Sequence, residues 1–232
     1  AVAFRAAAGQ TPSGNGTSTV GNKPTGTVDD DVMIANIYVE DDVAVTAPTG
    51  WTLIANLDHP TSTFDIHVYW KRASGEGASY TWTHANTWRN GMISSFSGCI
   101  TTGDPQDATA TNANGTASPE VSADLTTVTN DAMAVVCSGA FTTTNWSVPA
   151  GWSEAGEDDD DHMAYKAMPT AGAVGTASFT LSASGNWVAL TLAWSAFGKA
   201  LTGLPIDFQI QQQTAANAKE KGNRSALIAI AE

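Results

Sequence analysis

Internal repetition constrains the fold of this chain more than any other feature of its sequence. Five motifs of the first half recur in the same order in the second half, at offsets between 95 and 101 residues. The pairs are Asp31-Val32-Met33 with Asp131-Ala132-Met133 (offset 100), Pro48-Thr49-Gly50-Trp51 with Pro149-Ala150-Gly151-Trp152 (101), Tyr69-Trp70-Lys71 with Ala164-Tyr165-Lys166 (95), Tyr80-Thr81-Trp82 with Phe179-Thr180-Leu181 (99), and Trp88 with Trp187 (99). Loops of different length between strands would produce such small changes in offset. The sequence therefore predicts two half-repeats, at about 28–98 and 125–197.

The runs inside each half-repeat have the alternation of β-strands. In residues 66–70, Ile66, Val68 and Trp70 fall on one side and His67 and Tyr69 on the other, which is the period of two that a strand requires. Only 14% of the residues are charged, which is little for long surface helices. We expect an all-β protein: residues 1–200 as one antiparallel two-sheet sandwich, jelly-roll-like, whose half-repeats are related by approximate two-fold symmetry.

The repeat also sorts the eight tryptophans. Positions that are aromatic in both halves are more simply explained as core than as a sugar-binding surface. We therefore expect four paired rings to be largely buried, those of Trp51, Trp152, Trp88 and Trp187. Trp146 has no counterpart among the repeat motifs and follows a Thr-Thr-Thr-Asn run. It is the candidate for an exposed ring and for a glycan contact.

The sequence contains no recognisable catalytic constellation. A phosphate-binding glycine loop, a Gly-x-Ser-x-Gly elbow and a His-Glu-x-x-His pair are all missing from it. The four histidines, at positions 59, 67, 84 and 162, do not stand at ligand spacing from one another. We expect no enzymatic activity and no cofactor. A glycan-cleaving protein would need two carboxylates about 5–10 Å apart in a cleft.

Charge and hydropathy narrow the range of partners. The net charge of −13 repels phosphate backbones, so we expect no nucleic-acid binding. No run of 18 apolar residues occurs, so we expect no membrane span. Acidic runs at 29–31, 40–42 and 157–161 are interpreted as turns. A calcium ion at 157–161 is an alternative, but the EF-hand spacing and its glycine are missing, and no metal site is predicted.

Cys99 and Cys137 are the only cysteines. The simplest interpretation is two buried thiols that pack as small apolar residues. A single disulfide between them stays open as an alternative.

Residues 201–232 lie outside the repeat and form the C-terminal extension, which we expect to be an arm that contacts another chain. Its apolar pieces would invite pairing with a partner's edge, and its basic residues could meet an acidic surface. The alternative is an extra edge strand on the same sandwich. The candidate partner-binding residues are Phe208, Ile210, Lys219, Lys221, Arg224, Leu227 and Ile228.

The ordered motifs resemble a group of tailed-phage and prophage virion proteins. The residues that carry the resemblance are Asp31-Val32-Met33, Pro48-Thr49-Gly50-Trp51-Thr52, Tyr69-Trp70-Lys71, Gly75 to Trp82, Trp88 to Gly91 and Phe96-Ser97-Gly98. The resemblance implies a β-sandwich that decorates or cements the capsid of a virion. The expected partners are the major capsid protein or another virion protein, and further copies of the chain in a homo-oligomer. The alternative is a carbohydrate-binding adhesin on a head or tail fibre.

Overall fold

The computed structural model describes residues 1–8, 13–142 and 145–198, and these residues form strands joined by turns, without a helix. The predicted arm at 201–232 lies outside the described residues, together with all seven of its candidate contact residues. The first half contains β1 (Ala3–Ala8), β2 (Gly14–Asn22), β3 (Val32–Glu40), β4 (Thr52–Asp58), β5 (Phe64–Arg72) and β6 (Ser79–Ser97). The second contains β7 (Thr111–Gly115), β8 (Glu120–Val121), β9 (Ala132–Ala140), β10 (Trp146–Ser147), β11 (Ser153–Asp158), β12 (Asp161–Met168), β13 (Ser178–Leu181) and β14 (Trp187–Trp194).

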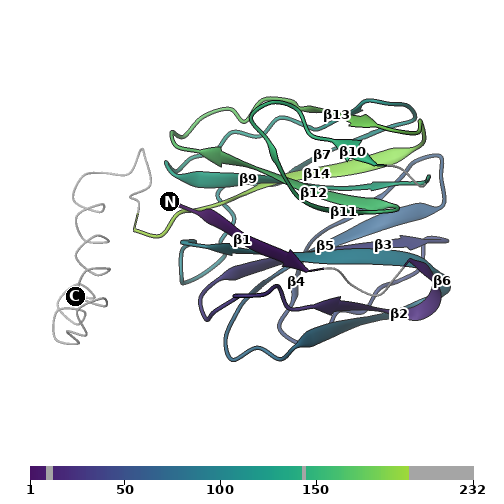
Figure 1. The fold of residues 1–232 in the computed structure, drawn as a ribbon, viewed down its shortest axis with the longest axis horizontal. Coiled ribbons are helices and arrows are strands. Elements are labelled where there is room, and N and C mark those ends of the chain that lie inside the picture. The colour runs from purple at the N-terminus through teal and green to yellow at the C-terminus, as the bar shows by residue number, and fades with distance from the viewer. Residues whose placement is uncertain (9–12, 143–144, 199–232) are drawn as a thin grey trace.

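Two large antiparallel sheets face each other at the centre of the molecule (Figure 1). The first has the strand order β1-β6-β3-β5-β4, with β2 paired to β6, and the second has the order β11-β12-β9-β14-β7. A small sheet, β10-β13-β8, lies over the outer side of the second sheet (Figure 1). The prediction of an all-β, antiparallel two-sheet sandwich is confirmed.

The strand order of the first half recurs in the second. The path β6-β3-β5-β4 corresponds to β14-β9-β12-β11, and β1 and β7 flank the two paths at equivalent places. Contacts between the sheets occur in matching pairs, since β3 contacts β12 while β9 contacts β5, and β6 contacts β11 while β14 contacts β4. An approximate two-fold axis between the halves would exchange the two sheets and so produce these matching contacts.

The strand register corrects three of the predicted offsets. Thr46 pairs with Thr83 as Ser147 pairs with Thr180, so Trp82 is equivalent to Phe179 at an offset of 97 rather than 99. Ile34 pairs with Trp70, and Val135 pairs with Tyr165. With Trp70 equivalent to Tyr165, Ile34 is equivalent to Val135 at an offset of 101, so the predicted offset of 100 for the first motif is wrong by one residue. Asp30 and Asp131, also 101 apart, both have positive φ, at 72° and 60°.

The predicted offset of 99 between Trp88 and Trp187 is also wrong. Val39 pairs with Arg89 and its equivalent Ala140 pairs with Trp187, so Trp187 corresponds to Arg89 rather than to Trp88. A one-residue slip moves a side chain to the other face of its sheet. Trp88 accordingly packs against the core between the sheets, whereas Trp187 belongs to the core on the outer side of the second sheet.

Three apolar cores hold these layers together. The central core, between the sheets, takes alternate residues of β3 and β9, including Val32, Ile34, Met133 and Val135. The remaining residues of β3 pack outward under Trp51, Tyr80 and Trp82, and those of β9 pack outward under the small sheet with Trp152 and Phe179. Because both faces of β3 and β9 are covered, these strands are apolar almost throughout rather than alternating.

Burial tests the expectations for single residues. Trp51, Trp152 and Trp187 are 8%, 9% and 5% exposed, as predicted, and Trp88 is buried less completely than these three, against the central core. Cys99 and Cys137 are buried and free, which confirms their interpretation as packed thiols.

Candidate functional site

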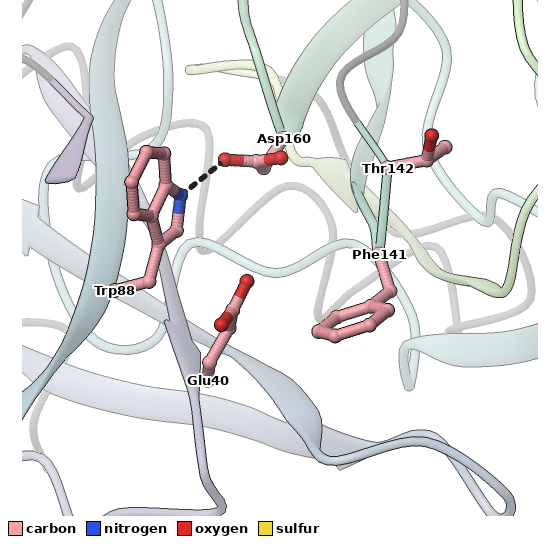
Figure 2. A pocket seen from close by; sticks show the side chains of 5 residues that line it. All are labelled: Glu40, Trp88, Phe141, Thr142 and Asp160. Atoms are coloured by element: carbon pink, nitrogen blue, oxygen red, sulfur yellow. Dashed lines mark hydrogen bonds between the residues drawn. The ribbon is translucent and has the colours of Figure 1, made fainter.

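A pocket of about 300 Å³ opens where the two halves meet, lined by Glu40, Trp88, Phe141, Thr142 and Asp160 (Figure 2). Glu40 is the last residue of β3, and Phe141 follows the last residue of β9. These two positions are equivalent in the halves at the offset of 101. Trp88 comes from the middle of β6, and Asp160 from the turn between β11 and β12. The size is at the lower end of the range for ligand pockets.

Acidic turns place the two carboxylates in the pocket. After Glu40 the chain turns through Asp41 and Asp42, which have positive φ of 63° and 49°. Aspartate adopts this region more readily than most residues. The tight turn between β11 and β12 contains Asp159 and Asp160, and the carbonyl of Asp160 accepts a hydrogen bond from the Ala140 amide. That bond ties the acidic turn to the end of β9.

Hydrogen bonds and burial set the state of the two carboxylates. The Trp88 indole Nε1–H donates to Asp160 Oδ2 over 2.7 Å (Figure 2), and the Tyr38 hydroxyl donates to Glu40 Oε1 over 3.5 Å. Burial raises the pKa of Glu40 above its ordinary value, and the negative charges of Asp160 and Asp41 raise it further. Burial also raises the pKa of Asp160, with Asp159 and Asp158 adding to it and the Trp88 hydrogen bond opposing it.

A third carboxyl group lies next to the pocket. Asp161 is fully buried, and neither of its carboxylate oxygens has a hydrogen-bond partner among the described residues. Burial and the charges of Asp158 and Asp160 raise its pKa well above the ordinary value. An unpaired charge in such a place would be very costly, so this side chain is held as a neutral acid.

The lining decides which chemistry the pocket supports. Carboxylates supply acceptor oxygens, and glycoside cleavage likewise uses two carboxyl groups in a cleft, at a defined separation. No group of three or more His, Cys, Asp or Glu in the described parts of the chain could hold a metal ion. The alternative of a calcium ion at the 157–161 run therefore finds no ligand cluster there.

Trp146 is not at this pocket, and its expected exposure is wrong. It is 4% exposed, and its indole Nε1–H donates to Glu120 Oε2 over 2.8 Å. Its ring stacks on that of His162, with the centroids 5.4 Å apart. Trp146 occupies the position of Val45 at the offset of 101, and Val45 packs against the core on the outer side of the first sheet. Trp146 therefore has a counterpart in the first half. It was not recognised because Val45 is aliphatic and lies just before the Pro48–Trp51 motif that defines the offset.

Sequence reasoning missed every residue of the pocket as a site residue. Glu40 and Asp160 were visible only as parts of acidic runs, and Trp88 was assigned to the core. Phe141 follows an apolar strand-like run and is 43% exposed in the structure, but nothing in the sequence distinguishes it from a core aromatic residue. The lining residues come from segments that are up to 120 positions apart in the chain. Their spacing along the sequence does not predict that they line one pocket.

Comparisons with protein-family models, with curated proteins and with solved structures found no match. The part of the chain that the structure describes contains no helix that could cross a membrane. The evidence on function therefore rests on the fold and on the pocket.

Proposed function

We propose that this chain is a non-enzymatic structural protein of a tailed-phage virion, which decorates or cements the capsid through protein–protein contacts. The observation that carries the proposal is the use of the repeat motifs for packing. Trp51, Trp82 and Tyr80 contact one another in the first half, and Trp152 contacts Phe179 in the second. The motifs that resemble those of virion proteins thus pack the layers of the sandwich together.

Contacts with further copies or with other virion proteins are part of the proposal. Strand β4 is an edge of the first sheet, and its Leu53 is 51% exposed. Val28 and Phe197 are also large apolar residues at the surface, 55% and 46% exposed. An edge strand with an exposed apolar side chain favours pairing with another chain.

Immunogold electron microscopy tests this proposal. Antibody against the chain should label regular positions on the heads of particles released by the source strain, and purified chain should cosediment with empty capsids. Unlabelled heads together with a failure to cosediment would contradict a capsid role. Light scattering of the purified protein measures the proposed homo-oligomer directly, and a monomer at all concentrations would contradict that part.

Glycan binding is the second candidate function, as on a head-fibre or tail-fibre adhesin. Trp146 no longer supports it, but the pocket does, since Trp88 and Phe141 lie beside two carboxylates there. A glycan array tests binding, and incubation with bacterial polysaccharide tests turnover. Turnover that is lost in Glu40→Gln and Asp160→Asn would contradict the non-enzymatic assignment.

A further inference from the structure

We infer that the pocket of Glu40, Trp88, Phe141, Thr142 and Asp160 binds an organic cation, namely an ammonium or guanidinium group. The cation belongs either to a small molecule or to a basic side chain of a partner protein. The inference rests on the pocket alone and holds whether or not the chain is a virion protein.

Charge is the first argument. Glu40 and Asp160 both line the pocket, and Figure 2 shows the Glu40 side chain extending toward Asp160. The ion pairs in the described parts of the chain join Arg5 to Asp31, His67 to Asp65 and Lys71 to Glu76. None of them neutralises the pocket. A bound cation would relieve the repulsion between the two carboxylates.

Hydrogen-bonding capacity is the second argument, and it separates a cation from a neutral sugar. The one indole N–H at the pocket, that of Trp88, is already donated to Asp160. The Thr142 hydroxyl is the remaining side-chain donor among the lining residues, while the carboxylates offer several free acceptor positions. Ammonium and guanidinium groups only donate, whereas sugar hydroxyls both donate and accept. The lining therefore matches a cation better.

A third argument comes from the first half, where one carboxylate and one aromatic ring already hold an ammonium group. Lys71 Nζ lies 2.7 Å from Glu76 Oε2 and 5.2 Å from the centroid of the Tyr80 ring. A carboxylate and an aromatic ring thus hold one ammonium group between them. At the pocket, two carboxylates stand together with the rings of Trp88 and Phe141, and no basic side chain of the described residues lines it.

The experiment is a titration of ¹⁵N-labelled protein, followed through the indole N–H signal of Trp88. The cationic probes are Nα-acetyl-arginine amide, Nα-acetyl-lysine amide, agmatine and glucosamine. The neutral probes are Nα-acetyl-citrulline amide and N-acetylglucosamine, which match two of them in shape. We expect a saturable shift with the cations and none with the neutral compounds.

Variants locate the binding. Glu40→Gln and Asp160→Asn should each weaken cation binding about tenfold, equivalent to about 1.4 kcal/mol, and Phe141→Leu should weaken it by a smaller factor. Glu154→Gln is the matched control. It removes the same negative charge as Glu40→Gln, but Glu154 lies on the exposed start of β11, outside the pocket. It should bind as the parent does. Asparagine at 160 can still accept the Trp88 hydrogen bond, so that variant tests charge without removing the bond.

The source of the cation follows from the same data. Tighter binding of the blocked amino acids than of agmatine and glucosamine indicates a partner's side chain, and the reverse order indicates a small molecule. The inference is overturned if no cation gives a saturable shift, if the neutral probes bind equally well, or if Glu154→Gln weakens binding as much as Glu40→Gln.

Discussion

The two halves of the molecule share one strand order but use their equivalent polar positions differently. Asp65 and His67 on β5 correspond to Asp160 and His162 at the start of β12, at the offset of 95. In the first half, His67 Nε2 lies 2.6 Å from Asp65 Oδ2, so the histidine and the carboxyl group lie against each other. In the second half, Asp160 instead accepts the Trp88 hydrogen bond.

His162, the counterpart of His67, has no carboxyl group of the described part of the chain beside it in this way. It is fully buried between the rings of Trp146 and Phe179 and has no hydrogen-bond partner among the described residues. Burial lowers its pKa to about 3, so it is neutral. Separating the acid from the histidine leaves Asp160 free to line a pocket. The duplicated backbone therefore fixes the layers, and the site depends on side chains from both halves, some of which, such as Asp160, make different contacts from their counterparts.

The largest expected effect is a difference in the free energy of unfolding between two alanine variants, at Trp187 and at Trp88. The uncorrected repeat treats these two residues as equivalents. Trp187→Ala removes a buried ring and should lower the free energy of unfolding by about 3–5 kcal/mol. Trp88→Ala should cost clearly less, because Trp88 is only partly buried at the pocket. Urea unfolding followed by circular dichroism measures both. Equal losses would contradict the corrected register.

Glu120→Gln tests the polar interior of the second half. Glu120 is fully buried, and burial raises its pKa to about 7, against hydrogen bonds from Ser138 and Trp146 that lower it. A raised folded pKa gives stability that is present at pH 4 and lost as pH rises towards 7. The stability of the variant relative to the parent should therefore increase over this range, by about 3 kcal/mol in total.

Unfolding at a series of pH values measures this change. His162 acts in the opposite sense, because its lowered pKa costs stability as the pH falls below its ordinary value near 6.5. The difference between the Glu120→Gln variant and the parent isolates Glu120, because His162 and the other titrating groups are the same in both proteins. A constant difference between the two proteins would contradict this account.

Asp161→Val sharpens the comparison at a third position, because the equivalent residue of the first half is Ile66. The substitution removes a buried carboxyl group without hydrogen-bond partners, and we expect a gain of about 1–3 kcal/mol at pH 7. The pKa of Asp161 is raised, so ionisation of the unfolded chain weakens the parent as the pH rises, and the gain should be smaller at pH 4. Thermal unfolding at the two pH values measures it, and a loss of stability at pH 7 would contradict the account.

Much of the fold, but not the site, was predictable from the sequence. Motifs in a fixed order predicted the duplicated sandwich, and Trp51 and Trp152 were correctly assigned to the core. A single-residue change in offset is not visible in motifs alone, and it paired Trp88 with Trp187, although the two rings lie on opposite faces of their sheets. The burial of Trp146 depends on Glu120, a partner 26 positions away that accepts its indole hydrogen bond. The pocket depends on the way the halves pack together.

The most direct test of the account measures the pKa of Glu40 by carbon-detected NMR, in the parent and in Asp160→Asn. The two carboxylates form one electrostatic unit at the junction of the halves. Burial and the negative charge of Asp160 should hold the pKa of Glu40 above its ordinary value in the parent, and Asp160→Asn should lower it part of the way. An ordinary pKa for Glu40 in both proteins would contradict the account.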